Sequence, residues 1–360
     1  MKILHTEASC GWGGQEIRIL SEASGLRDRG HEVTLVCPRE ARIFEEAGKL
    51  SLSVQALPIA RKSIAGWRAL RDFLRQTPVD VINTHSSTDS WLVALACATL
   101  RAAPPLVRTR HISAPISSSW TTRWLYSRAS AHIATTGEAL RRDVIAATGI
   151  APERVTSVPT GIDTERYVPG NRLAARRLLG LDESAPIVGI VATLRVWKGH
   201  RYLVDAVARL APEVRLVIVG DGPQSEALRT QIETIGQPDR FLMAGNREDV
   251  QNWLQAFDLF VLPSYANEGV PQALMQAMAV GLPCITTQVG AIGELAHDED
   301  TALVVKPQDT GALVNAIERL FRDSALAQSL GTRARQFVVA HHGREAMLDK
   351  MEAIFNAVQA

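Results

Sequence analysis

An acidic side chain and a predicted helix start lie close together in the second half of the sequence. Glu268 stands in the polar loop 264–269, which follows the apolar run 259–262 and precedes Pro271. Proline is favoured in the first turn of a helix, where its missing N–H costs no hydrogen bond. A helix N-terminus presents unpaired N–H groups and partial positive charge, which attract a phosphate or another anion. This stretch therefore predicts a carboxylate beside an anion site.

Two glutamines extend this candidate site. Gln272 and Gln276 are four residues apart, which places them on one face of the predicted helix. Their long amide side chains can hydrogen-bond the hydroxyl groups of a ligand. Glu268 could equally be a solvated residue of an ordinary surface loop, and this stretch alone does not distinguish the two interpretations.

A second candidate anion site precedes another predicted helix. The apolar run 187–193 is followed by Leu-Arg-Val-Trp-Lys-Gly, which places Arg195 and Lys198 together in one loop. Arginine forks onto phosphate oxygens, and lysine adds a compact positive charge. Two basic loop residues are usually only solvated. Their place at the carboxyl end of a predicted strand, where ligands bind in parallel sheets, favours the functional interpretation.

Histidines follow two predicted strands in the first half of the chain, at His85 and His111. Strand ends are where a site is expected. A single histidine is more often structural than functional. His111 is the better candidate, because Arg108 and Arg110 flank it and would favour anionic ligands nearby.

The start of the chain has the pattern of a nucleotide-binding α/β domain. The strand pattern 2–5 is followed by a glycine-containing loop, a helix pattern that ends at Gly30, and a second strand pattern, 32–37. Gly13 and Gly14 would let the backbone approach a ligand closely. The loop does not match G-x-G-x-x-G, and no acidic residue ends the second strand, so the pattern argues against a dinucleotide cofactor.

Length and composition indicate two globular domains. The 360 residues exceed one domain of ordinary size, and 46% hydrophobic with 21% charged residues is typical of a soluble protein. We see no apolar run long enough to cross a bilayer and no signal peptide. The four cysteines are scattered, without the spacing of a disulfide framework or a metal site. We therefore expect a reduced, cytoplasmic chain.

Strand and helix patterns alternate through both halves, which predicts an α/β protein with two parallel sheets. The first domain is expected over 1–165. The turn-rich segment 164–171, with Pro169 and Gly170, is typical of a linker. The second domain is expected over 171–340, and a final helix pattern follows over about 344–360.

Positive charge is concentrated in the window 50–142. This window holds twelve Lys and Arg against four Asp and Glu, a net +8, and the rest of the chain carries −7 to give +1 overall. Such a basic half indicates an acidic partner, such as an anionic membrane, a phosphorylated glycan or a nucleic acid. Within the window, 61–75 alternates basic residues with Ile64, Trp67, Leu70 and Leu74. This amphipathic pattern fits a helix that rests on anionic lipid or one that packs its apolar face on the sheet.

Five short motifs in order identify a family resemblance over essentially the whole chain. The chain resembles the family 4 glycosyltransferases, retaining enzymes of the GT-B fold that use sugar nucleotides. The motifs are Gly13-Gly14-Gln15-Glu16, Pro159-Thr160-Gly161-Ile162-Asp163, Arg195 with Lys198, Val219-Gly220-Asp221-Gly222-Pro223, and the block from Glu268 to Ala279. Each is weak alone, but together they are specific.

The resemblance implies two Rossmann-like domains that face each other across a cleft. The first domain, on which the final helix packs back, would bind the acceptor, and the second would bind the nucleotide sugar. The implied catalytic residues are Glu268, His111, Arg195 and Lys198. The implied donor-binding residues are Gly13, Gly14, Gly245, Asn246, Arg247, Gly269, Val270, Gln272 and Gln276.

One position departs from the family pattern. Gln276 stands where a second acid usually holds the nucleotide ribose. Glutamine can still hydrogen-bond ribose hydroxyls, but it carries no charge. The departure keeps open a catalytically silent nucleotide-binding relative, and a sugar-nucleotide epimerase would share the fold and the donor.

The expected reaction needs no metal and no resident cofactor, only a nucleoside-diphosphate sugar as co-substrate. The basic window favours a glycan or glycolipid acceptor of a lipopolysaccharide or other surface polysaccharide. It also favours peripheral contact with the inner face of the cytoplasmic membrane, and no nucleic acid is expected as a partner.

Overall fold

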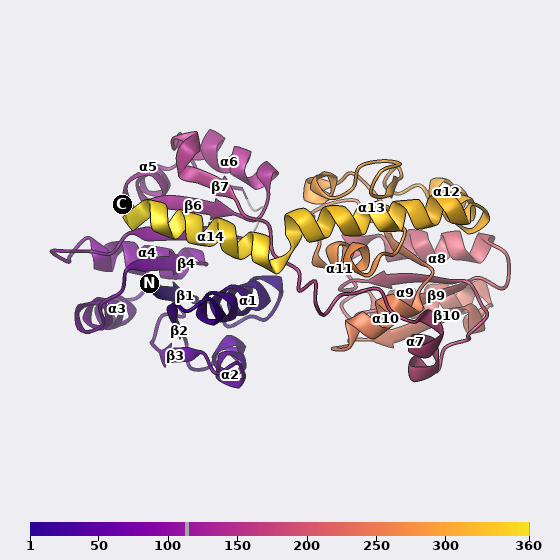
Figure 1. Cartoon of the computed structure of the whole chain (residues 1–360), viewed down its shortest axis with the longest axis horizontal. Helices are drawn as coiled ribbons and strands as arrows, with labels where there is room; N and C mark the ends of the chain where they lie inside the picture. The colour runs from indigo at the N-terminus through magenta and orange to yellow at the C-terminus, as the bar shows by residue number, and fades with distance from the viewer. Residues whose placement is uncertain (112–114, 360) are drawn as a thin grey trace. The chain divides into compact units, whose positions relative to one another are not determined.

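The computed structural model describes residues 1–111 and 115–359, which form two compact units (Figure 1). Unit 1 comprises Met1–Gly161 and the C-terminal segment from Arg344, and unit 2 comprises Ile162–Gly343. Both are α/β units built on parallel sheets, as the alternating strand and helix patterns predicted.

Unit 1 contains a parallel sheet with the strand order β3-β2-β1-β4-β5-β6-β7. Its strands are β1 (Lys2–Thr6), β2 (Glu32–Cys37), β3 (Ser53–Ala56), β4 (Val81–Thr84), β5 (Leu106–Arg110), β6 (His132–Thr135) and β7 (Val155–Ser157). Its helices are α1 (Gly14–Asp28), α2 (Arg42–Lys49), α3 (Ile64–Gln76), α4 (Ser87–Cys97), α5 (Trp120–Trp124), η1 (Leu125–Ala129), α6 (Glu138–Thr148), η2 (Pro152–Arg154) and α14 (Arg344–Gln359). The order reverses between β1 and β4, which is the doubly wound arrangement that places ligands at the carboxyl edge.

Unit 2 contains a second parallel sheet with the order β10-β9-β8-β11-β12-β13. Its strands are β8 (Ile187–Val191), β9 (Arg215–Val219), β10 (Phe241–Gly245), β11 (Leu259–Leu262), β12 (Cys284–Thr286) and β13 (Leu303–Val304). Its helices are α7 (Arg172–Leu179), η3 (Val196–Lys198), α8 (His200–Arg209), α9 (Ser225–Ile235), η4 (Pro238–Arg240), α10 (Val250–Ala256), α11 (Gln272–Val280), η5 (Gly290–Glu294), α12 (Thr310–Arg322) and α13 (Ser324–His342).

Each sheet is buried on both faces, which explains the continuous apolar runs of its central strands. In β1, Ile3 packs into the core cluster shared with α1 and α14, and the next residue, Leu4, packs into the opposite cluster with α3 and α4. In β8, Ile187 and Val188 divide in the same way between two clusters of unit 2. Alternate side chains of a strand point to opposite faces, so these strands have no solvent-facing side.

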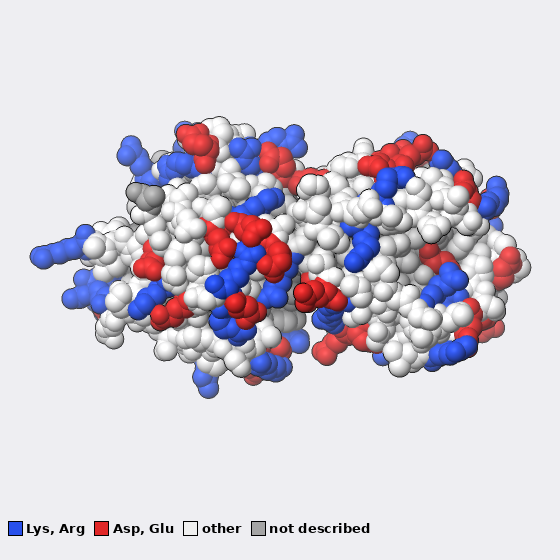
Figure 2. Space-filling model, viewed as in Figure 1, with Lys and Arg blue, Asp and Glu red and all other residues white. Residues whose placement is uncertain are grey.

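The final helix, α14, belongs to unit 1 and packs along α1 (Figure 1). Leu348 fits against Gly25, where an added Cβ would lie 2.5 Å from a Leu348 methyl carbon. Arg29, the C-cap of α1, pairs with Glu352 at 2.7 Å and with Asp349 at 2.9 Å. Positive and negative side chains accordingly alternate over this part of unit 1 (Figure 2).

The basic amphipathic segment forms α3, whose apolar face packs on the body of unit 1. Leu70 and Leu74 are buried, and Trp67 packs against the same core. Of the two interpretations of this pattern, packing on the protein is confirmed. Arg61, Lys62, Arg68 and Arg75 of the segment are exposed, as is Ile64 at 69%. Figure 2 shows Lys and Arg side chains projecting from this part of unit 1. No helix among the described residues is long and apolar enough to span a bilayer.

Candidate active site and family

The unit 2 residues singled out in the sequence lie in loops at one edge of the sheet. β8 and β11 are parallel neighbours, so the loop that carries Arg195 and Lys198 and the loop that carries Glu268 leave the sheet side by side. Tyr265 of the second loop donates its backbone N–H to the carbonyl of Trp197 in the first, at 2.8 Å. The two candidate anion sites predicted separately from the sequence are therefore one site.

Lys198 and Glu268 form a largely buried ion pair at the centre of this site. The Lys198 Nζ lies 2.7 Å from Oε1 and 2.9 Å from Oε2 of Glu268. The side chain of Glu268 is 4% exposed and that of Lys198 is 20% exposed. The Ser264 hydroxyl donates a further hydrogen bond to the same carboxylate. Glu268 is thus held in one orientation and is not the solvated loop residue of the alternative interpretation.

The loop after β12 supports the backbone of Glu268. Ala291 donates its N–H to the Glu268 carbonyl at 3.1 Å, and the Thr287 hydroxyl donates to the Ser264 carbonyl. The side chain and main chain of Glu268 are therefore fixed by groups that follow three adjacent strands. Such support is what a pre-organised charged site requires, because its groups need not reorient during the reaction.

Gly199 allows the first two loops to approach. Its φ is +76°, and an added Cβ would lie 2.1 Å from the Pro263 carbonyl oxygen. We expect Gly199→Ala to push these loops apart and to lower Tm by several degrees more than Gly236→Ala. Gly236 also has positive φ, +72°, but nothing lies within 4 Å of its Cβ position, so this control carries only the backbone strain. Equal Tm losses in the two variants would contradict the expected clash.

The other basic residue of the first loop is more accessible. Arg195 is exposed, and its guanidinium carbon lies 5.7 Å from the centre of the Trp197 ring. It is therefore placed to meet an anion without first leaving an ion pair, whereas Lys198 must share its charge with Glu268.

The helix after Glu268 begins where the sequence indicated. Pro271 is the N-cap of α11, which runs from Gln272. Gly269 is exposed and Val270 is partly buried beside Glu268, while Gln272 and Gln276 are half-buried along α11.

Three of the predicted donor-binding residues lie at the end of β10, at the far side of the sheet. Gly245 ends that strand with φ +72°, and Asn246 and Arg247 are exposed. The Arg247 Nε donates to the Ala244 carbonyl at 2.8 Å. The structure places these residues at the same carboxyl edge as Glu268, but three strands away in the order β10-β9-β8-β11.

In unit 1, Gly13 and Gly14 lie at the start of α1, directly after the β1 loop. Gly13 is the N-cap of α1 in an extended conformation, and Gly14 is the first residue of the helix. Glycine at this turn keeps the backbone accessible at the carboxyl edge of the first strand.

His111 is the outer member of a chain of three imidazoles at the same edge of unit 1. Its Nε2 lies 2.9 Å from His85 Nδ1, and the His85 Nε2 lies 2.9 Å from His5 Nδ1. The His5 and His85 rings stack with an interplanar angle of 9°. The two histidines that the sequence marked at strand ends are therefore connected, and His5, inside β1, is a third member that the sequence analysis missed.

These imidazoles are neutral near pH 7. Burial lowers the pKa of His5 to about 3. It also holds the pKa values of His85 and His111 well below their ordinary range, and the positive charge of Arg18 lowers them further. His111 can therefore exchange hydrogen bonds with a ligand, but it does not supply a positive charge.

The arginines that flank His111 in sequence contact Tyr126. Arg108 is buried with its guanidinium carbon 4.6 Å from the Tyr126 ring centre, and Arg110 donates to the Tyr126 hydroxyl at 3.0 Å. Both arginines are therefore engaged with this tyrosine, which their sequence positions did not indicate.

Comparison with known proteins agrees with this arrangement. Residues 12–166 match the family described as Glycosyltransferase Family 4, and residues 185–323 match the family described as Glycosyl transferases group 1. The chain belongs to the family 4 glycosyltransferases. The two matched segments include every predicted site residue, in unit 1 and unit 2 respectively.

Relatives with assigned activities show what similar chains do. The chain is 25% identical to an Escherichia coli UDP-Gal:alpha-D-GlcNAc-diphosphoundecaprenol alpha-1,3-galactosyltransferase, over 99% of this chain and 96% of that protein. It is 30% identical to the lipopolysaccharide core biosynthesis mannosyltransferase LpsB of Rhizobium meliloti, over 57% of this chain and 64% of that protein. It is also similar to the crystal structure of Anabaena Alr3699/HepE in complex with UDP, with a TM-score of 0.85, 22% identity and coverage of 99% and 100%. That likeness establishes the GT-B fold.

Two buried acids of this glycosyltransferase were not singled out in the sequence. Glu7 accepts the Ser9 backbone N–H at 2.6 Å and the Gln15 side-chain amide, which ties the glycine-containing loop to β1. Burial, reinforced by the negative charge of Asp89, raises the pKa of Glu7 to about 8. Asp89 accepts the Thr6 hydroxyl at 2.7 Å. Both acids organise the edge of the sheet where His111 lies.

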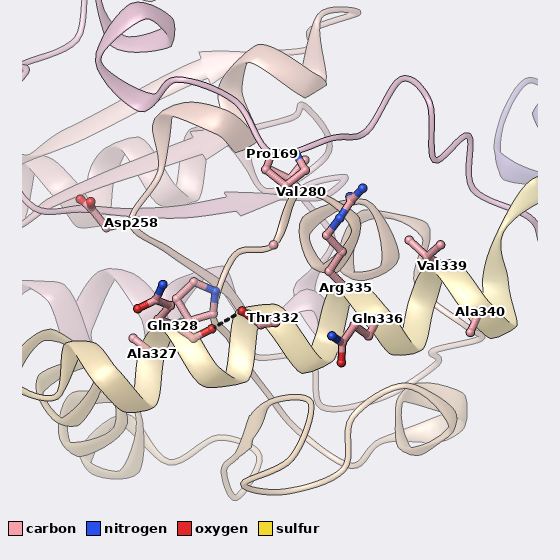
Figure 3. Close-up of a pocket in the computed structure, with 13 residues that line it drawn as sticks. Pro169, Asp258, Val280, Ala327, Gln328, Thr332, Arg335, Gln336, Val339 and Ala340 are labelled. Carbon is pink, nitrogen blue, oxygen red and sulfur yellow. Dashed lines mark hydrogen bonds between the residues drawn. The ribbon is translucent and has the colours of Figure 1, made fainter.

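The site of this glycosyltransferase does not coincide with the cavity shown in Figure 3. That cavity, of about 840 Å³, lies beside α13 at the opposite side of unit 2 from Glu268, where β11 and β12 begin. Asp258 and Pro283, which precede those strands, line it together with Arg335 and Gln336. None of the predicted site residues lines this cavity. Within residues 1–111 and 115–359, no group of three or more His, Cys, Asp or Glu is arranged to hold a metal ion.

Proposed function

We propose that this protein transfers a sugar, with retention of anomeric configuration, from a nucleoside-diphosphate sugar to a hydroxyl group of a glycan or glycolipid. The observation that carries the proposal is the Lys198–Glu268 pair with Arg195 beside it, where the loops after β8 and β11 meet. A buried carboxylate beside two cations suits a substrate that combines a sugar with a diphosphate.

The chemistry of donor cleavage matches these charges. As the bond between the anomeric carbon and the diphosphate breaks, negative charge grows on the leaving phosphate and positive charge grows on the sugar. Arg195, Lys198 and the N-terminus of α11 would stabilise the phosphate. Glu268 would lie against the sugar, where its carboxylate orients the hydroxyls and stabilises positive charge.

Retention follows from attack on the face that the phosphate leaves. The acceptor oxygen forms its bond to the anomeric carbon on that face, and the departing phosphate takes the proton of the acceptor hydroxyl. This route needs no carboxylate nucleophile, which is consistent with a Glu268 carboxylate engaged by Lys198 and Ser264. The transferred unit is expected to be a hexosyl or related sugar.

The remaining donor contacts would come from residues carried over from the family. His111 would contact the transferred sugar, and Gly13 and Gly14 would approach the donor through their backbone. Gly245, Asn246 and Arg247 would frame the base. Gln276, which is half-buried on α11, would hold the ribose by hydrogen bonds without charge. UDP is the first nucleotide to test, because the Escherichia coli relative uses UDP-Gal.

An acidic acceptor in surface polysaccharide synthesis is the best match on the acceptor side. The Escherichia coli relative acts on a sugar linked to diphosphoundecaprenol, and the Rhizobium meliloti relative acts in lipopolysaccharide core synthesis. In this chain, exposed Arg61, Lys62 and Arg68 surround exposed Ile64 near the start of α3. These residues would contact an anionic membrane from its cytoplasmic side.

Thermal unfolding with nucleotides tests the proposal. We expect UDP, or one other nucleoside diphosphate among GDP and ADP, to raise Tm by several degrees at millimolar concentration, with NAD as the negative control. A ligand at about 100 times its Kd stabilises the folded state by about 2.7 kcal/mol. A shift with NAD alone would refute the proposal. A nucleotide shift followed by no sugar transfer would favour a silent relative, and conversion of the donor sugar without an acceptor would favour an epimerase.

A further inference from the structure

The three imidazoles of unit 1 must share one hydrogen-bond direction. A neutral imidazole has one N–H donor and one bare acceptor nitrogen. His85 uses both of its nitrogens, one toward His5 and one toward His111, each at 2.9 Å. If His85 donates to His111 it must accept from His5, and if it accepts from His111 it must donate to His5. The tautomers of the three residues are therefore coupled.

Only two arrangements satisfy both hydrogen bonds. In the first, the N–H groups point outward: His5 Nδ1–H donates to His85, His85 Nδ1–H donates to His111 Nε2, and the remaining His111 proton lies on Nδ1. In the second, all N–H groups point inward, so His111 Nδ1 is bare and His5 Nε2 carries a proton. The two arrangements give His111 opposite capacities toward a ligand at Nδ1, donor in the first and acceptor in the second.

His5, the buried inner member of the three imidazoles, favours one of the two hydrogen-bond arrangements. His5 is fully buried, and its Nε2 has no hydrogen-bond partner among the described residues. A buried N–H without an acceptor is rarer in proteins than an under-satisfied acceptor. The inward arrangement would create such an N–H at His5 Nε2, whereas the outward arrangement leaves only a bare nitrogen there. The outward arrangement is therefore favoured.

The surroundings also keep the three imidazoles neutral, as the coupling of their tautomers requires. Arg18 and Glu22, both fully buried, pair at 3.6 Å beneath this edge, and the Asn83 amide donates to Glu22 at 2.9 Å. Asp89 accepts the backbone N–H of His85 and not its ring. No carboxylate among the described residues is hydrogen-bonded to any of the three imidazole rings, so nothing in contact with the rings stabilises an added proton.

We propose that His85 is a positioning residue, oriented in turn by His5, which holds His111 in the Nδ1–H tautomer so that His111 donates a hydrogen bond to an oxygen of the transferred sugar. The contact with the sugar rests on the proposed function. The tautomer is a property of the protein without substrate and can be measured independently of activity.

The direct test is nitrogen NMR of protein labelled with ¹⁵N-histidine, because bare and protonated imidazole nitrogens have clearly different ¹⁵N shifts. The His111 signals are assigned by their loss in His111→Gln. In the wild-type protein we expect a protonated Nδ1 and a bare Nε2 on His111, unchanged from about pH 8 to about pH 6. A bare Nδ1 on His111 in the wild-type protein would overturn the proposal whatever the activity.

Variants at His85 test whether that residue sets the tautomer. His85→Leu removes the donor to His111, and we expect the Nε2–H form of His111 to become the major species. His85→Asn keeps an N–H at the Nδ1 position and should restore the Nδ1–H form. His132→Leu is the matched control. His132 is a partly buried histidine that contacts Thr156 at 2.8 Å, and it is not one of the three hydrogen-bonded imidazoles. An unchanged His111 tautomer in folded His85→Leu would refute the role of His85.

Kinetics then test the contact with the sugar. We expect His85→Leu to lower kcat about tenfold, with the donor KM changed by less than about twofold, and His85→Asn to recover most of the loss. His132→Leu should leave both constants unchanged. A tautomer change without a kcat change would refute the sugar contact. If the wild-type protein transfers no sugar from any donor, the proposed function fails, while the NMR result still decides the tautomer.

Discussion

Replacing Glu268 by glutamine is expected to lower kcat for sugar transfer by about 100- to 1000-fold, a loss similar to that from removing one fixed electrostatic group from an active site. The carboxylate is 4% exposed and is held by Lys198 and Ser264. Glutamine preserves its size but removes the negative charge that faces the developing positive charge of the sugar. It also leaves the ammonium group of Lys198 without its counter-ion.

The stability and the donor KM of Glu268→Gln distinguish an effect of the lost charge from an effect of misfolding. The donor KM should change by less than about threefold, because Arg195 and Lys198 still bind the diphosphate. Glu268→Asp, which keeps the charge on a shorter side chain, should recover part of kcat. Glu318→Gln is the control, because Glu318 is an acid on the surface of α12, paired with Arg322. Near wild-type kcat in a folded Glu268→Gln protein would rule out the proposed role of the carboxylate.

The architecture of the chain was predictable because its local signals are strong. Buried parallel strands appear as short apolar runs between turn residues, and β8, β11 and the start of β1 were located in this way. Pro271 likewise marked the start of α11. The short helix α7 after the linker and the π-helical turn η1 were not singled out, since neither has a long periodic pattern.

The contacts within the site were less predictable, because they join residues far apart in the sequence. Lys198 was expected to bind phosphate, but no local pattern indicated that it pairs with Glu268, 70 residues later. His5 lies inside a strand pattern, and its link to His85 spans 80 residues. Such pairs become neighbours only through the strand order, with β8 beside β11 for Lys198 and Glu268 and β1 beside β4 for His5 and His85. The expectation that site residues lie at strand ends identifies His85 and His111. It cannot identify His5, which is buried inside the neighbouring strand β1.

The second large effect is expected at the buried ion pair beneath the histidines. Arg18 and Glu22 are both fully buried, with Nε and Oε2 at 3.6 Å. Arg18 also donates to the Val158 carbonyl at 2.6 Å. We expect Arg18→Leu or Glu22→Leu alone to lower the free energy of unfolding by about 3–5 kcal/mol, because each leaves an uncompensated buried charge. Urea unfolding followed by tryptophan fluorescence measures the loss.

The double variant and an exposed pair provide the controls. Arg18→Met combined with Glu22→Leu removes both charges and should be close to wild type in stability, or above it. Glu183→Ala breaks the solvent-exposed pair with Arg177 and should leave Tm unchanged within error. If the double variant loses as much free energy of unfolding as the two single variants together, that loss comes from packing and hydrogen bonding and not from an unpaired charge.

The pH dependence distinguishes the two single variants. Burial raises the pKa of Glu22, and the positive charge of Arg18 opposes that rise. Without Arg18, the folded-state pKa of Glu22 must rise further above its unfolded value, so the folded state binds a proton more tightly and gains stability as pH falls. The deficit of Arg18→Leu relative to wild type should therefore shrink from about pH 8 to about pH 5. Glu22→Leu has no carboxyl group to titrate while the wild type does, so its deficit should not shrink as pH falls. A parallel recovery in both variants would show that Glu22 is not the titrating group.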